Sequence, residues 1–172
     1  TATERTKDPK GNITQKTYDK VGRLKYVTAD GQTTEYTYYN NGNRQSVIYP
    51  NGLKEEYTYY KNNQLYTLTN KKADGTVMDT YTYKYDLAGN QTSKLEIING
   101  VSKGTTTYGY DVQNRLNKVT EPNGRVTAYS YDAAGNRTKE TITQSGQPTI
   151  ANGYSYNEQN RLKTLTTKID GA

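Results

Sequence analysis

The chain contains no cysteine, histidine, phenylalanine or tryptophan among its 172 residues. Without cysteine there is no disulfide framework, no thiol nucleophile and no thiolate metal ligand. Without histidine the chain also lacks the commonest general base and the imidazole metal ligand. We therefore expect no catalytic residues, no metal site, no cofactor and no enzymatic activity.

Aliphatic residues are also scarce, and this shortage alone would favour a disordered chain. Tyrosine reverses that expectation, because the sequence has 19 of them. Tyrosine favours strands, buries a large ring and keeps a hydroxyl that tolerates water. A sheet covered by tyrosine and threonine can therefore be ordered without a thick aliphatic core. No run of residues is long and apolar enough to span a membrane.

The charge balance is basic but evenly spread. Lysine and arginine number 23 against 17 acidic residues, which gives a formal net charge of +6. The basic residues occur throughout the chain, often beside Glu or Asp, and form no single block. This pattern predicts a generic basic surface, and we expect no nucleic-acid partner.

A repeated unit fills the sequence, in which a Tyr-x-Tyr pair or its remnant leads into a polar turn. We call the second tyrosine of each pair the anchor; the anchors are Tyr18, Tyr38, Tyr59, Tyr85, Tyr110, Tyr131 and Tyr156. Four positions later only Gly or Asn occurs, at Gly22, Gly42, Asn63, Gly89, Asn114, Gly135 and Asn160. A repeat of 20–26 residues matches two strands and two turns.

The residues on either side of each anchor predict a β-hairpin. Before the anchor, residues alternate with period 2, as in segment 81–85 (Tyr-Thr-Tyr-Lys-Tyr), so the tyrosines share one face of a strand. After it, Asp132 occupies the first position of a type I turn, where its carboxylate can accept a backbone bond. Gly135 supplies the left-handed backbone that rejoins the strands.

A second class of turn closes each unit, as in Asp30-Gly31, Pro50-Asn51-Gly52 and Pro122-Asn123-Gly124. Alternation of the two classes predicts an all-β fold, an antiparallel meander of about fourteen strands. Residues 1–172 would form a single array of about seven repeats, incomplete at both ends, so we expect a piece of a longer protein. A twisted strip of that width should curl or spiral.

Three segments resemble the YD repeat of the Rhs family: 18–24 (Tyr-Asp-Lys-Val-Gly-Arg-Leu), 83–90 (Tyr-Lys-Tyr-Asp-Leu-Ala-Gly-Asn) and 129–137 (Tyr-Ser-Tyr-Asp-Ala-Ala-Gly-Asn-Arg). Tyr39, Tyr60 and Asn157 replace the Asp of that motif. The resemblance implies a segment of a large secreted or cell-surface protein, of bacterial origin. In toxins of that family a β-strip forms a hollow shell around a C-terminal effector domain, so the partner would be the rest of the same polypeptide.

Two other functions fit the same residues. The first tyrosines of the pairs could stack on glycans or cell-wall polymer; these are Tyr36, Tyr57, Tyr83, Tyr108, Tyr129 and Tyr154. Bare edge strands at the ends of the strip could pair with another copy and build a fibre. The arginines that follow the turns are expected to stack on tyrosine rings or to pair with Glu and Asp across strands.

Overall fold

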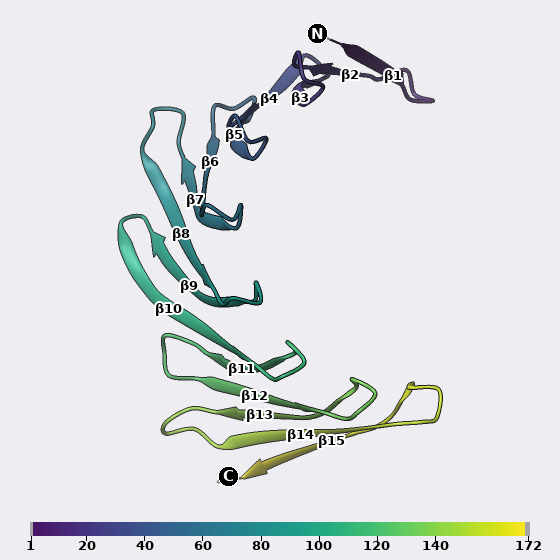
Figure 1. Cartoon of the computed structure of the whole chain (residues 1–172), viewed down its shortest axis with the longest axis vertical. Helices are drawn as coiled ribbons and strands as arrows, with labels where there is room; N and C mark the ends of the chain where they lie inside the picture. The colour runs from purple at the N-terminus through teal and green to yellow at the C-terminus, as the bar shows by residue number, and fades with distance from the viewer. Residues whose placement is uncertain (1, 171–172) are drawn as a thin grey trace. The chain divides into compact units, whose positions relative to one another are not determined.

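The computed structural model describes residues 2–170, and every regular element in that range is a β-strand. The strands are β1 (Thr3–Lys7), β2 (Ile13–Tyr18), β3 (Leu24–Ala29), β4 (Gln32–Tyr38), β5 (Arg44–Ile48), β6 (Lys54–Tyr59), β7 (Leu65–Lys71), β8 (Val77–Tyr85), β9 (Gln91–Ile98), β10 (Val101–Tyr110), β11 (Leu116–Thr120), β12 (Val126–Tyr131), β13 (Arg137–Thr143), β14 (Thr149–Tyr156) and β15 (Leu162–Asp170). The fifteen strands follow one another in chain order in a single sheet (Figure 1).

This topology confirms the predicted antiparallel meander. Each even-numbered strand ends at an anchor tyrosine, from Tyr18 in β2 to Tyr156 in β14. Fifteen strands form instead of about fourteen, because the seven anchor hairpins contain β2 to β15 and β1 precedes them as one additional strand. The strip's predicted curvature stays a prediction.

The packing divides the described residues into two compact units. The first contains residues 2–82 and Glu96–Ser102, and the second contains Tyr83–Leu95 and residues 103–170. Within each unit, strands that are neighbours in the chain lie side by side (Figure 1). The prediction that the repeats form one domain, a single array of about seven, stays a prediction.

The spacing of the second turn class sets the strand lengths. Where the turn glycine precedes the anchor by 7 residues, as at Gly52 and Tyr59, the strand has 6 residues in β6. Where the interval is 10 residues, as at Gly100 and Tyr110, β10 has 10 residues. Insertions in the repeat therefore lengthen strands and leave the anchor turns unchanged.

The sheet has almost no enclosed core. Among residues 2–170 only Ser46, Val47 and Thr127 are buried, at 4%, 3% and 7% exposure. Ser46 and Val47 are adjacent in β5, so their side chains point to opposite faces. Side chains cover both faces of a layer one strand thick, and stability must come from contacts along the sheet.

Candidate functional site: the row of anchor turns

The anchor turns are the seven turns that follow the anchor tyrosines, and all share one backbone geometry. In the first, the Gly22 N–H donates to the Asp19 carbonyl and the Asp19 N–H donates to the Arg23 carbonyl, at 3.2 and 2.8 Å. The same two bonds recur in the other six turns. The fourth residue after each anchor has a positive φ, for example 90° at Gly135 and 60° at Asn114. Such a φ is accessible to glycine and, among other residues, most readily to asparagine.

A β-bulge follows each anchor turn whose strand register is described. In the β2–β3 hairpin Tyr18 pairs with Leu24 while Thr17 pairs with Tyr26, so Lys25 is an extra residue. The same shift occurs in β4–β5, β6–β7, β10–β11, β12–β13 and β14–β15. A bulge increases the local twist of a strand pair. The sequence pattern did not indicate these bulges.

The first residue of the strand after an anchor turn lies beyond the end of the hydrogen-bonded ladder with the following strand. Its backbone carbonyl accepts a hydrogen bond from the hydroxyl of the next anchor tyrosine. Pairing between β11 and β12 extends only from Thr120 to Lys118 on β11. The Tyr131 hydroxyl donates to the carbonyl of Leu116, just past that end, at 2.6 Å. Equivalent bonds join Tyr38 to Leu24, Tyr110 to Gln91 and Tyr156 to Arg137, at 2.7, 2.8 and 2.8 Å. The anchor tyrosines therefore connect one repeat to the next.

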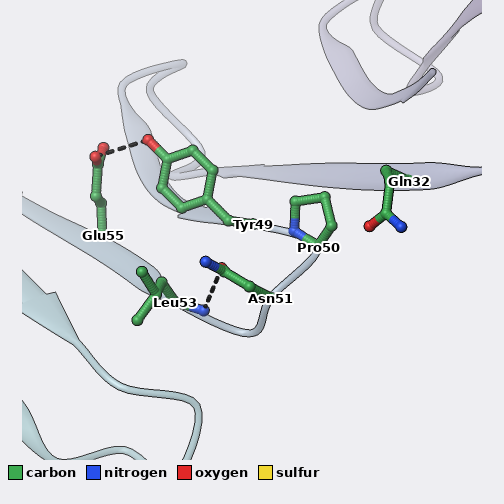
Figure 2. Close-up of a pocket in the computed structure, with 6 residues that line it drawn as sticks. All are labelled: Gln32, Tyr49, Pro50, Asn51, Leu53 and Glu55. Atoms are coloured by element: carbon green, nitrogen blue, oxygen red, sulfur yellow. Dashed lines mark hydrogen bonds between the residues drawn. The ribbon is translucent and has the colours of Figure 1, made fainter. Parts of the chain in front are cut away.

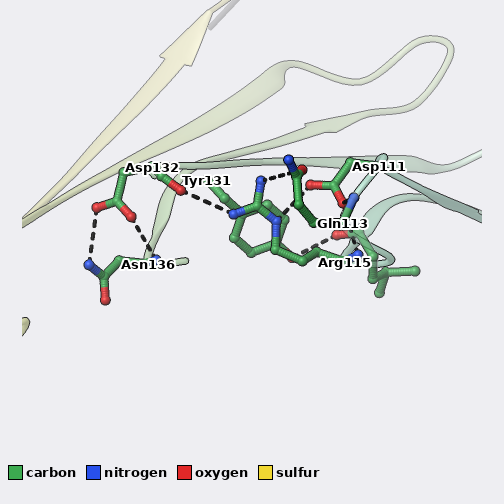
Figure 3. A network of polar contacts seen from close by, with 7 residues as sticks. Asp111, Gln113, Arg115, Tyr131, Asp132 and Asn136 are labelled. Atoms are coloured by element: carbon green, nitrogen blue, oxygen red, sulfur yellow. Dashed lines mark hydrogen bonds and ion pairs between the residues drawn. The ribbon is translucent and has the colours of Figure 1, made fainter. Parts of the chain in front are cut away.

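Arginine forms a second connection between neighbouring anchor turns. Arg115 donates from Nε to Asp111 of its own turn at 2.7 Å and from Nη1 to the Asp132 carbonyl of the next turn at 3.0 Å. Its guanidinium lies over the Tyr131 ring, 4.7 Å from the centroid (Figure 3). Arg23 repeats this arrangement in the first unit. The predicted stacking of these arginines on tyrosine rings is confirmed. Their acidic partners, which were expected across strands, lie instead in the same turn.

Asparagine makes the connection where arginine is missing. The Asn136 amide donates to the Asp132 carboxylate of its own turn and to the Asn160 side chain of the next turn, at 3.0 and 2.9 Å. Asn90 and Asn43 bond in the same way to Asn114 and Asn63, at 2.8 Å each. Asn in place of Gly at the positive-φ position therefore has a second role, as the acceptor of a bond from the preceding turn.

The turn aspartates are held in their charged form. Hydrogen bonds from the side chain and backbone of Asn136 lower the pKa of Asp132 below its ordinary value. At Asp19 the backbone N–H of Arg23 is the largest cause of a lowered pKa. A carboxylate accepts such bonds better when ionised. The turns are therefore most stable above the ordinary pKa of aspartate.

The first tyrosines of the pairs are all half-buried; they are Tyr36, Tyr57, Tyr83, Tyr108, Tyr129 and Tyr154. Arg137 lies over the rings of both Tyr129 and Tyr154, at 5.5 and 4.7 Å from the centroids. Arg44 lies 5.1 Å from the Tyr36 centroid. A guanidinium already stacks on three of the six rings, and their use as a glycan platform stays a prediction.

The described part of the chain offers neither a cluster of metal ligands nor a helix suited to a membrane. Residues 2–170 contain no group of three or more acidic, His or Cys side chains that could hold a metal ion. Over the same range no helix has the length and apolar character needed to cross a membrane. Within each unit, side chains of the anchor turns bond to the turn that follows.

The sequence matches the family described as RHS Repeat at residues 18–55, 100–126 and 118–147, which together cover half of the chain. The chain belongs to the RHS repeat family. The matched segments include anchor turns from both units, among them the Arg115–Asp132 connection. No curated protein matches the chain by sequence.

Two solved structures share the fold. The Photorhabdus luminescens Tc holotoxin pore with a TccC3 mutation superposes with a TM-score of 0.70 at 20% identity, over 94% of this chain and 11% of the matched one. The TcdB2-TccC3 crystal structure gives a TM-score of 0.71 at 20% identity, over 94% and 12%. The chain therefore spans about one ninth of the length of these matched chains.

Proposed function

We propose that this chain is a non-catalytic wall segment of a secreted or surface-exposed bacterial RHS-repeat protein, and that the wall encloses a toxin or effector domain of the same polypeptide. The carrying observation is the bonding between successive anchor turns. Within each unit it joins successive repeats of a sheet that has almost no enclosed core.

The similar structures support this assignment by their context. The first is named as a Tc holotoxin pore and the second as TcdB2-TccC3, and in both the matching segment is a small fraction of a long chain. A layer one strand thick has two extended faces and little interior of its own. Because its stability depends on contacts within the sheet, such a layer does not need to be covered on either face. It is therefore suited to separating two compartments.

Cysteine labelling tests the proposal, because the chain has no cysteine of its own. Thr166 and Thr167 are adjacent exposed residues of β15, and their side chains point to opposite faces. Thr166→Cys and Thr167→Cys would be made separately in the full parent polypeptide and in the isolated segment. A large maleimide reagent should label only one of them rapidly in the parent and both rapidly in the segment.

Equal labelling rates at the two positions in the parent would contradict an enclosing wall. Deletion of the downstream domain from the parent polypeptide is the control that separates the effect of the wall from that of the enclosed domain. If the slow position stays slow without that domain, the wall itself excludes the reagent. If it becomes fast, the enclosed domain was covering that face.

Self-association of the isolated segment is a second candidate function, and the exposed apolar side chains of β15 favour it. Leu162, Leu165 and Ile169 are 56%, 57% and 56% exposed there. Unpaired edge strands with exposed apolar residues pair readily with other chains. Light scattering of the isolated chain should then show a mass that rises with concentration, and Leu165→Lys should suppress the rise. A constant monomer mass would exclude this function.

A further inference from the structure

Asparagine is followed directly by glycine at five places in the chain, which are Asn41, Asn51, Asn99, Asn123 and Asn152. At such a pair the backbone nitrogen of the glycine can attack the side-chain Cγ of the asparagine, because glycine has no Cβ to hinder the approach. The attack releases ammonia and closes a cyclic imide. Water then opens the imide and gives aspartate or isoaspartate. The reaction needs a glycine N–H and an asparagine amide that are both free to move.

The turn that contains Asn51 holds both of these groups. The Gly52 N–H donates to the Tyr49 carbonyl at 2.9 Å, and Oδ1 of Asn51 accepts from the Leu53 N–H at 3.1 Å. Figure 2 shows the Asn51 side chain turned back onto Leu53, at the edge of an open groove that Gln32 and Tyr49 also line. A glycine N–H that is bonded to a carbonyl is directed away from the side chain that its nitrogen would attack.

Three other pairs are held in a similar way. Asn41 and Asn123 lie in turns with the same two hydrogen bonds. Asn152 lies within β14, where its side-chain amide donates to Glu140 at 2.8 Å. The glycine that follows it, Gly153, is paired with both neighbouring strands. In four of the five pairs the fold therefore restrains the reacting groups.

The fifth pair, Asn99-Gly100, is the exception. It forms the two-residue turn between β9 and β10, with φ values of 50° and 75°, and both residues are exposed. The Asn99 backbone N–H donates to the Met78 carbonyl at 2.6 Å, which fixes the turn without occupying the reacting groups. Among residues 2–170 no hydrogen bond engages the Gly100 N–H or the Asn99 side chain.

We propose that Asn99 is a modification site, at which the folded chain deamidates spontaneously. The Gly100 nitrogen forms a bond to Cγ of Asn99, and the bond from Cγ to the amide nitrogen breaks. The Gly100 N–H proton leaves with that nitrogen as ammonia, and one water molecule is consumed when the imide opens. The formal net charge falls by one from +6. The proposal is independent of the enclosing role, because it depends on a single turn.

The two products should affect the turn differently. Asp30-Gly31 forms a turn with φ values of 50° and 74°, so the same geometry already accepts aspartate. Isoaspartate adds one methylene to the main chain. Two-residue turns connect strands well because their backbone twist matches that of the strands. Isoaspartate at position 99 should therefore open the end of the β9–β10 hairpin, whereas aspartate should leave it closed.

Peptide mapping by mass spectrometry, after incubation of the folded protein at neutral pH in heavy-oxygen water, tests the proposal. Asn99 should deamidate about tenfold faster than Asn51 and Asn123, because a hydrogen bond must break before attack at those two residues. In urea the rates at the three residues should become similar. Equal rates in the folded protein would overturn the proposal. A difference that persists in urea would also overturn it, because the cause would then be the local sequence.

Two substitutions place a new Asn-Gly pair in each kind of turn. Asp30→Asn lies in a two-residue turn like that of Asn99 and should deamidate about as fast. Asp74→Asn is the matched control, because the Gly75 N–H donates to a carbonyl at 2.9 Å and the residue 74 side chain accepts from the Thr76 N–H at 2.9 Å. This residue should react slowly. Circular dichroism would verify the fold of both variants. An unreactive Asp30→Asn, or an Asp74→Asn that reacts as fast as Asn99, would contradict the proposed cause.

Discussion

The anchor turns and the opposite turns lie at the two ends of the same strands, but they differ in uniformity. All seven anchor turns share one set of backbone bonds. The opposite turns are mixed: Asp30-Gly31 and Asn99-Gly100 are two-residue turns with positive φ at both positions, whereas Tyr49–Gly52 repeats the four-residue geometry. One end of the strands is constant and the other varies.

The difference follows from what each turn contacts. An anchor turn inside a unit, such as Asp111–Arg115, accepts a bond from the preceding turn and donates one to the following turn, so its residues are constrained on both sides. An opposite turn such as Glu121–Arg125 can be closed by its own ion pair. Fewer constraints leave room for side chains such as Tyr49 and Leu53, which shape a groove.

Replacing an anchor-turn glycine should have the largest effect on this comparison. Gly135 has a φ of 90°, which a β-branched residue adopts only with strain. Gly135→Val should cost about 3 kcal/mol of unfolding free energy, the upper range for a strained residue. Urea denaturation would measure it, with Ser93→Ala as the control expected to change little. Equal midpoints for the two variants would contradict the turn assignment.

Arginine substitutions compare the two ends of the strands directly. Arg115 and Arg125 both follow a positive-φ turn residue, but only Arg115 bonds to a neighbouring anchor turn. Arg115→Ala should destabilise the protein by about 1–2 kcal/mol through lost stacking and the lost carbonyl bond. Arg125→Ala should cost less than about 0.5 kcal/mol, since the side chains of its ion pair are 40% and 35% exposed and screened by water. Thermal unfolding of both would test the difference, and similar losses would refute the special role of the anchor row.

Removal of one anchor hydroxyl should have a smaller effect. Tyr131→Phe deletes the bond to the Leu116 carbonyl and keeps the ring, so about 1 kcal/mol should be lost. Tyr66 is a suitable control because it is 42% exposed, and Tyr66→Phe should be neutral. Denaturation midpoints that move equally in both variants would show that the hydroxyl bond contributes nothing specific.

Acid should weaken the anchor turns. The pKa of Asp132 is lowered in the folded state, so its stabilisation is complete above the unfolded value, about 3.9. It is lost as the pH falls from there through the lower folded pKa. Unfolding midpoints between pH 5 and 2 should therefore fall more steeply for the parent than for Asp132→Asn. A variant with the same pH slope would exclude a contribution from this carboxylate.

Much of the fold was predictable because the pattern is local and repeated. Alternation around Tyr83 and Tyr85 indicates strands, and Asp-x-x-Gly indicates the turn that follows. The bulges after the anchor turns were not predictable, since the extra residue, such as Lys25, carries no distinctive side chain. The count of strands differed for a simpler reason, because one additional strand, β1, precedes the first anchor hairpin.

The candidate site was only partly predictable. Gly and Asn at the fourth position indicate positive φ, but nothing local shows that Asn160 also accepts a bond from Asn136 in the previous turn. The groove lined by Gln32, Tyr49 and Leu53 was not predicted, because these residues lie in separate segments of the sequence. The glycan hypothesis was placed on the first tyrosines of the pairs, and the structure brings arginines onto three of those rings.

The sequence by itself determined the strand order, the positions of the turns and the positive φ of the Gly or Asn in each turn, because hairpins depend on residues a few positions apart. Only the tertiary structure decided which side chains link one repeat to the next and where the opposite turns leave a groove. Those features depend on residues about 20 positions apart, such as Arg115 and Asp132. Their contact requires a register fixed by backbone pairing and by bulges, and these have no signature in the sequence.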